Sequence, residues 1–255
     1  MNTAAINPKG PRPPAPGNSA KVWAETYLGS SVGSKILVAF TGVGLVTFVV
    51  FHLIGNLKLF QGREAINHYA DFLKHDLGVL IWIARAGLLT IFVLHLSIAI
   101  RLKQKAVAAR PIGYVNAVSA QSSVAATTMI WTGVVVGAFV LFHLAHFTFA
   151  WCHDAVGPDG RLVNYLDLKD AKGRHDVYAM MIAGFSTWWI SVLYLLAQGF
   201  LFVHLSHGIP SSVQTLGLMN RRFTRAVKAL GVGLAAAIFL GNAAIVIAVW
   251  RGWVA

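Results

Sequence analysis

Cysteine, acidic residues and charge in general are scarce in this chain. Cys152 is the only cysteine, which excludes an internal disulfide, and the chain has no CxxCH motif for covalent haem attachment. A cysteine cluster for an iron–sulfur centre and a glycine-rich nucleotide-binding motif are also missing. Any chemistry that needs an iron–sulfur cluster or a bound nucleotide therefore has to come from other chains.

The low charge goes with a high apolar content. Of the 255 residues, 12% are charged and 56% are hydrophobic, and the mean hydropathy is +0.64. About 20 apolar residues in a helix suffice to cross a bilayer. The sequence therefore predicts an all-α membrane protein with five transmembrane helices, at about residues 36–59, 79–100, 129–151, 183–205 and 229–250.

The ends of this predicted domain are polar. Residues 1–20 contain "INPKGPRPPAPGNSA", which is rich in proline and lacks the apolar core of a signal peptide, so we expect a flexible cytoplasmic tail. Residues 21–255 then form a single transmembrane domain. Residues 113–128 are polar enough either to lie along the interface or to extend the third helix.

The net charge of +12 is distributed unevenly between the loops. Basic residues precede the first span, follow the second and precede the fifth, whereas every acidic residue except Glu25 falls in the other loops. The positive-inside rule places the N-terminus in the cytoplasm and the C-terminus outside. Because the charges sort by membrane side, we expect lipid contacts and no nucleic-acid partner.

Histidines occur inside four of the five predicted spans. His52 and His143 lie near the outer ends of two outward-running helices, each roughly 10 Å inside the membrane boundary. His95 and His204 lie in the inner half of two inward-running helices. Each layer thus receives one histidine from each of two helices, as two six-coordinate haems stacked across the membrane would require.

The first and third spans share an internal repeat. "TGVGLVTFVVFHL" begins at Thr41 and "TGVVVGAFVLFHL" begins at Thr132, with histidine eleven residues after threonine in both. The repeat indicates equivalent roles for His52 and His143. The glycine after each threonine leaves room for a flat ligand or for a close helix contact.

Other roles for these histidines stay open at this stage. A single membrane histidine often only hydrogen-bonds a neighbouring helix, and a proton relay is another use. A structural zinc ion would need its ligands around one point, whereas these four separate into two layers.

Three further residues are candidates for contacts with haem propionates or quinone. His146 and His207 each follow a proposed ligand by three residues and so share its helix face. Arg85 lies six residues into the second span and would pair with a propionate or extend to the lipid headgroups. Four other histidines fall in outer loops, where we expect them to be solvated: His68, His75, His153 and His175.

Several stretches resemble one family, the dihaem cytochrome b membrane anchor of succinate dehydrogenases and fumarate reductases, in its form with one five-helix polypeptide. They are "TGVGLVTFVVFHLIGNLKLF" with "INHYADFL", "LHLSIAIRLK" around His95, the second "TG…FHL" span, and "HLSHGIPSSVQTLG" from His204. The last motif is the most specific, and the similarity covers nearly the whole chain after the tail.

The resemblance implies two non-covalent b haems with bis-histidine ligation. His52 and His143 would hold the distal haem, and His95 and His204 the proximal haem near the cytoplasm. His207 remains the alternative to His204. The resemblance also implies quinone as substrate, with menaquinone as the family expectation, and the outer loops offer Glu64, Asp71, His68 and His75 as quinone-site candidates.

The partners implied are a flavoprotein subunit with FAD, which performs the dicarboxylate chemistry of the tricarboxylic acid cycle, and an iron–sulfur subunit. Together they would form respiratory complex II in the bacterial cell membrane, as one complex or a higher oligomer. Two alternatives remain open: the cytochrome b subunit of a hydrogenase or formate dehydrogenase, and a passive anchor without haem.

Overall fold

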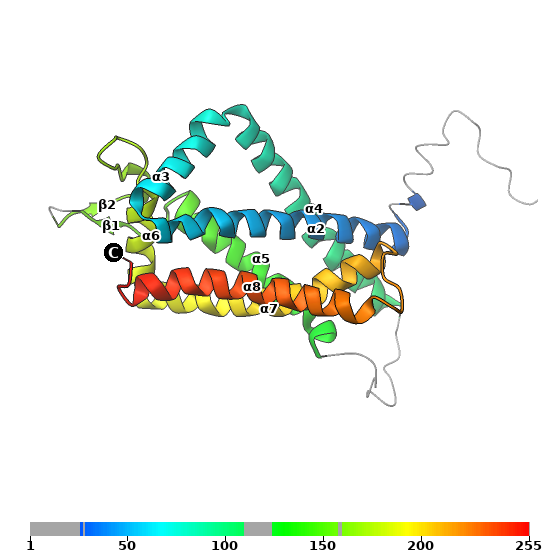
Figure 1. Ribbon diagram of the computed structural model, residues 1–255. Coiled ribbons are helices and arrows are strands. Elements are labelled where there is room, and N and C mark those ends of the chain that lie inside the picture. Colours follow the sequence, from blue (N-terminus) through cyan, green and yellow to red (C-terminus); the bar gives the residue numbers. More distant parts are fainter. Residues whose placement is uncertain (1–25, 28, 110–123, 158–159, 255) are drawn as a thin grey trace, which may run out of the picture.

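The computed structural model of the protein describes residues 26–27, 29–109, 124–157 and 160–254 (Figure 1). Five of the helices in these ranges are long and apolar enough to cross a membrane, which confirms the five predicted spans. They comprise α2 (Ser31–Asn56), α4 (Val79–Ala108), α5 (Val124–His143), α7 (Trp188–Thr215) and α8 (Thr224–Trp250). The predicted tail, residues 1–20, lies outside the described residues.

Shorter elements connect these helices. The 3-10 helix η2 (Leu57–Gln61), the helix α3 (Arg63–Asp71) and the π-helical turn η3 (Phe72–Asp76) join α2 to α4. A second π-helical turn, η4 (Leu144–Thr148), extends α5. Before α7 come the strands and short helices β1 (Ala155–Val156), β2 (Leu162–Val163), η5 (Tyr165–Asp167) and α6 (Val177–Ser186), with β1 and β2 paired antiparallel.

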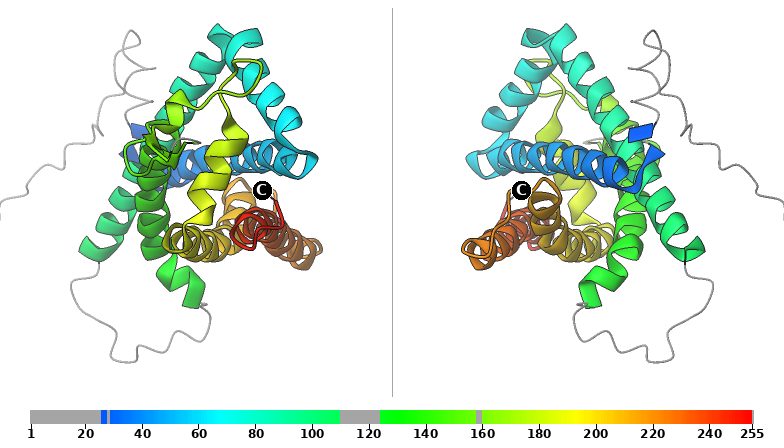
Figure 2. Two further views of the ribbon diagram at one scale, coloured as in Figure 1. Left: turned by 90° about the vertical axis from the view of Figure 1, so that its left-hand side faces the viewer. Right: turned by 90° about the vertical axis from the view of Figure 1, so that its right-hand side faces the viewer.

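The helices form one bundle in which α7 and α8 make an antiparallel hairpin. α2 lies beside this hairpin, α5 crosses α7, and α4 descends at a steep angle to cross α2 near its N-terminal half (Figures 1 and 2). The main core lies between α2, α6, α7 and α8 and includes Leu53, Phe185, Ile190 and Ile238. The bundle therefore has two distinct ends, each built from several connections.

The loop-rich end contains α3, β1, β2, α6 and the C-terminus (Figure 1). The opposite end contains the start of α2, the end of α4 and the α7–α8 turn, and we call it the basic end. Its described charged residues are all basic: Lys35, Arg101, Lys103, Lys105, Arg221, Arg222, Arg225 and Lys228. The described acidic residues lie away from the basic end, in α3, in η3 and in the connection between η4 and α6, so the charge asymmetry expected from the loops is present in space.

The fourth span differs from its prediction. Hydropathy places its start at residue 183, but the chain turns at Thr187, where the backbone is extended, and α7 begins at Trp188. Ser191 Oγ donates a 2.6 Å hydrogen bond to the carbonyl of Phe185 across this turn. α6 is a separate apolar helix at the end of the bundle, and apolar content alone does not distinguish it from the span that follows.

Other spans are longer than hydropathy indicated. α4 continues to Ala108 and α7 to Thr215, because charged and polar side chains at a helix end can extend to the membrane surface. Within the ambiguous stretch 113–128, residues 124–128 belong to α5 and extend the third span; the remainder lies outside the described residues.

α7 and α8 pack closely where Gly231 meets Pro210. A Cβ atom at Gly231 would lie 2.9 Å from Cδ and Cγ of the proline ring, whereas at Gly233 it would meet nothing within 4 Å. Pro210 lies inside α7 and is buried. The absence of a side chain at Gly231 therefore sets the helix separation near the basic end.

Candidate functional site: two pairs of membrane histidines

The four predicted membrane histidines form two pairs along the bundle. We call His52 and His143 the distal pair and His95 and His204 the proximal pair. The distal pair lies near the ends of α2 and α5, toward the loop-rich end. His95 and His204 each follow the first residue of their helices by sixteen positions, roughly 24 Å along the axis, toward the basic end.

The two distal rings are in T-shaped contact. The ring centres of His52 and His143 are 5.8 Å apart, and the ring planes are nearly perpendicular at 87°. His52 also stacks on Phe48, with ring centres 5.3 Å apart. The His52 side chain is exposed and His143 is partly buried, so the pair is accessible to a ligand.

This spacing suits a metal bound between two imidazoles. Two metal–nitrogen bonds of about 2 Å, plus about 1 Å from each nitrogen to its ring centre, place the ring centres about 6 Å apart. A haem iron takes four ligands from the porphyrin and needs only two from the protein. The observed 5.8 Å therefore fits the axial ligation that the resemblance implies.

Tyr194 connects His143 to His146. Its hydroxyl lies 3.2 Å from His143 Nδ1 and 3.0 Å from His146 Nδ1. His146 is fully buried, and its Nε2 atom has no hydrogen-bond partner. The single tyrosine proton can serve only one of the two imidazoles, so the other must donate its Nδ1–H to the tyrosine oxygen.

The proximal histidines make matching contacts with the repeated threonines. His95 Nδ1 lies 3.1 Å from Thr41 Oγ1 and 3.2 Å from the carbonyl oxygen of Val38. His204 Nδ1 lies 3.2 Å from Thr132 Oγ1. Three of the four histidines thus engage the protein through Nδ1, which leaves Nε2 available for a metal.

The remaining candidates, His207 and Arg85, make other contacts. His207 is adjacent to Ser206 Oγ, 2.9 Å from its Nδ1 atom, and it is His204 that contacts Thr132. Arg85 is exposed, and its guanidinium lies 4.8 Å from the centre of the Trp82 ring. This contact fits an arginine extending along the helix surface, as in the lipid-facing alternative.

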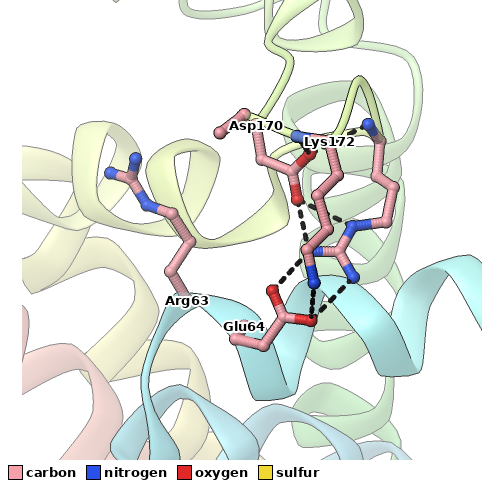
Figure 3. Close-up of a pocket in the computed structure, with 6 residues that line it drawn as sticks. Arg63, Glu64, Asp170 and Lys172 are labelled. Atoms are coloured by element: carbon pink, nitrogen blue, oxygen red, sulfur yellow. Dashed lines mark hydrogen bonds and ion pairs between the residues drawn. The ribbon is translucent and has the colours of Figure 1, made fainter.

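The loop-rich end is held together by an ion-pair cluster (Figure 3). Arg174 bonds Glu64 of α3 at 2.8 Å and Asp170 at 2.6 Å, and Lys172 reaches Glu64 at 2.7 Å. Hydrogen bonds from Arg174 and then Lys172 lower the pKa of Glu64 to about 2. Burial acts to raise the pKa of Asp170, but hydrogen bonds from Arg174 outweigh it and the pKa falls to about 2. These carboxylates stay charged and tie α3 to the loop before α6.

Beneath this cluster lies a fully buried asparagine. Asn67 Nδ2 donates to Asp176 Oδ1 at 2.9 Å, and Asn67 Oδ1 accepts from the backbone N–H of Tyr178 at 3.0 Å. Asp176 in turn caps α6 by accepting from Ala179 N at 3.0 Å. Asn67, part of the "INHYADFL" stretch, therefore fixes α3 against the start of α6.

The loop histidines differ among themselves. His68 and His75 are exposed, as predicted, and His75 pairs with Asp71 at 2.7 Å. His153 is instead partly buried, with Nδ1 2.6 Å from the Tyr165 hydroxyl and Nε2 3.1 Å from Thr187 Oγ1. The expectation that His153 is solvated was wrong, because Tyr165 of η5 and Thr187 pack against it.

Within the described ranges, no group of three or more His, Cys, Asp or Glu side chains is arranged to hold a metal ion. No family model, curated protein or solved structure matches the chain. The sequence motifs and the geometry of the two histidine pairs are therefore the features that bear on function.

Proposed function

We propose that the chain is the membrane-anchor cytochrome b subunit of a succinate:quinone oxidoreductase, acting as a succinate dehydrogenase or fumarate reductase. In this role it carries electrons between an iron–sulfur partner and membrane quinone through two b haems. Succinate and fumarate are interconverted on a flavoprotein partner.

The distal histidine pair is the observation that carries the proposal. Two imidazoles from different helices meet inside a membrane bundle with their ring centres 5.8 Å apart, a spacing that would suit two histidine ligands of one haem iron. A second pair on two other helices contacts two equivalent threonines nearer the basic end. Two separate pairs suit two stacked haems better than one clustered metal ion.

The residues of the chain would bind the haems, orient their histidine ligands and shield the electron path. A bound haem supplies a one-electron carrier at each pair. His52 and His143 would hold the distal haem, and His95 and His204 the proximal haem, each imidazole binding through Nε2. Thr41, Thr132 and Tyr194 would orient the rings through Nδ1. The surrounding apolar helices keep water and ions away from the electron path.

The charge asymmetry supports an orientation and a docking face. The positive-inside rule puts the basic end in the cytoplasm and the loop-rich end outside the bacterial cell membrane. The iron–sulfur subunit would then dock at the basic end, near residues 101–105 and 221–228, next to the proximal pair. The same Lys and Arg side chains would also bind anionic lipid headgroups.

The quinone, menaquinone by family expectation, would react beside the distal pair near the loop-rich end. Among the loop candidates, Glu64 is bound by Lys172 and Arg174, and Asp71 is bound by His75. His68 is exposed. It is therefore the first group to substitute when the quinone site is mapped.

Purification of the tagged chain from its native membrane tests the function. We expect a flavoprotein and an iron–sulfur subunit to copurify and succinate to reduce b-type haem in the complex. A hydrogenase or formate dehydrogenase catalytic subunit in their place, with no haem reduction by succinate, would refute the assignment. A flavoprotein complex without any haem would identify a passive anchor.

A further inference from the structure

The repeated Thr–Gly pair meets the proximal histidines in the same way in both halves of the chain. Thr41 and Gly42 of α2 contact His95 of α4, and Thr132 and Gly133 of α5 contact His204 of α7. Both threonines are buried, at 8% and 6% exposure. The repeat therefore has a second role besides supplying the distal histidines, which lie eleven residues further on.

Each threonine oxygen is set up to accept a hydrogen bond from its histidine. Thr41 Oγ1 donates its single proton to the carbonyl of Leu37 at 2.8 Å or that of Val38 at 3.1 Å. Thr132 Oγ1 donates to the carbonyl of Met129 at 3.0 Å. With that proton used, the oxygen accepts from Nδ1–H of the imidazole, and the Nε2 lone pair remains free.

The glycines provide the space that the imidazoles occupy. A Cβ atom at Gly42 would lie 3.2 Å from Cε1 of His95, and one at Gly133 would lie 3.1 Å from Cε1 of His204. Both distances are tighter than ordinary contacts, so an alanine at either position would push the ring away. Threonine thus fixes the rotation of each ring, and glycine fixes its distance from the helix.

The spacing within the repeat links the two layers. Eleven residues correspond to about three helical turns, so Thr41 and His52 project from nearly the same face of α2, about 16 Å apart along its axis. Thr132 and His143 have the same relation on α5. Each of these two helix faces therefore carries a distal histidine and, about three turns away, contacts a proximal histidine of a neighbouring helix.

We propose that Thr41–Gly42 and Thr132–Gly133 are equivalent positioning pairs for the proximal haem ligands His95 and His204, an inference that rests on the proposed function. Acceptance of the Nδ1–H bond makes the imidazole more basic and so favours ferric iron. Neither pair contacts the distal rings, so its effect is confined to the proximal haem.

Thr41→Val and Thr132→Val test the hydrogen bonds in the purified complex, because valine keeps the shape of threonine without its oxygen. We expect a higher midpoint potential for the proximal haem and about tenfold weaker haem retention, the lower end of the usual effect. The distal haem should keep its potential. Serine at either position should restore the wild-type values.

Thr47→Val is the matched control for the threonines. Thr47 lies on α2, is exposed, and donates at 2.9 Å to the carbonyl of Val43, with no histidine contact. Its replacement should leave both potentials unchanged. A proximal potential unaffected by both Thr→Val variants, or failure of serine to restore it, would overturn the inference.

Gly42→Ala and Gly133→Ala test the space for the rings. They should shift the proximal spectrum and lower proximal haem occupancy, whereas Gly87→Ala, where an added Cβ meets nothing within 4 Å, should not. An unchanged proximal spectrum in both alanine variants would overturn the spatial part of the inference. Absence of b haem from the wild-type complex would instead refute the proposed function.

Discussion

Tyr194→Phe should weaken and retune the distal haem site. The substitution removes the hydroxyl that lies 3.2 Å from His143 Nδ1 and 3.0 Å from His146 Nδ1, and it leaves the phenyl ring in place. If His143 binds iron through Nε2, its Nδ1–H donates to Tyr194 and the tyrosine proton goes to His146. The variant therefore removes both hydrogen bonds of the Tyr194 hydroxyl, one to each histidine.

Two arguments give the size of the effect. Loss of a partner to a metal-bound histidine commonly lowers metal affinity by about 10- to 100-fold, which corresponds to about 1.4 to 2.8 kcal/mol. Leaving a buried polar atom without its partner costs about 1 to 3 kcal/mol, and His146 is fully buried with Nε2 already unpaired. Both values are large enough to measure.

The assay is an optical redox titration of the purified complex together with the rate of haem loss to excess apomyoglobin. The distal haem should be lost about 10 to 100 times faster. Its midpoint potential depends on which oxidation state loses more affinity for the site. If the affinity for ferric haem falls tenfold more than the affinity for ferrous haem, the potential should rise by about 59 mV. The proximal haem should not change.

Tyr165→Phe is the matched control. Tyr165 is also fully buried and its hydroxyl lies 2.6 Å from a histidine Nδ1, but that histidine, His153, is not a proposed ligand. The control should destabilise the loop-rich end without altering either haem spectrum. If both variants retain the distal haem with wild-type potential and loss rate, the assignment of Tyr194 is refuted.

Three further predictions concern the scaffold. Asn67→Ala removes two buried hydrogen bonds, one to Asp176 and one from the backbone N–H of Tyr178, and should lower stability by about 1 to 3 kcal/mol in thermal unfolding. A wild-type melting profile would contradict this. Protection of the α3 amides against hydrogen exchange, measured relative to the intrinsic exchange rate at each pH, should stay high from neutral pH to about 4.5 and fall as pH falls toward 2, because the depressed pKa of Glu64 makes its ion pairs stabilising only while it is ionised. Glu64→Gln should show the lower protection already at neutral pH, and equal protection in both proteins at pH 7 would contradict the ion-pair role. Gly231→Ala should cost about 1 to 3 kcal/mol by overpacking α7 against α8, whereas Gly233→Ala, which has open space, should not; equal melting temperatures would contradict the close contact.

The spans were predictable because a bilayer imposes a length and an apolar composition on each of them. The break before α7 was not, since α6 is as apolar as a span and only its packing at the end of the bundle separates the two. Ser186 and Thr187 at the break are residues that favour helix ends, which is the only local indication of it.

The histidine pairs could be predicted in part. Depth and the repeat predicted that His52 lies near His143, and the ring centres of these two residues are 5.8 Å apart in the structure. The repeat also marked Thr41 and Thr132, but their contacts with His95 and His204 depend on which helices are neighbours, and sequence periodicity does not reveal that. Tyr194 gave no indication because His143 lies 51 residues away in sequence.

The haem content per chain of the purified complex tests the central claim most directly. A pyridine haemochrome assay with reduced-minus-oxidised spectra should give two b haems in the wild type. His52→Ala and His143→Ala should each remove the same haem, and His95→Ala and His204→Ala the other. A wild-type complex with one haem or none, or a paired loss that does not follow these two couples, would contradict the account.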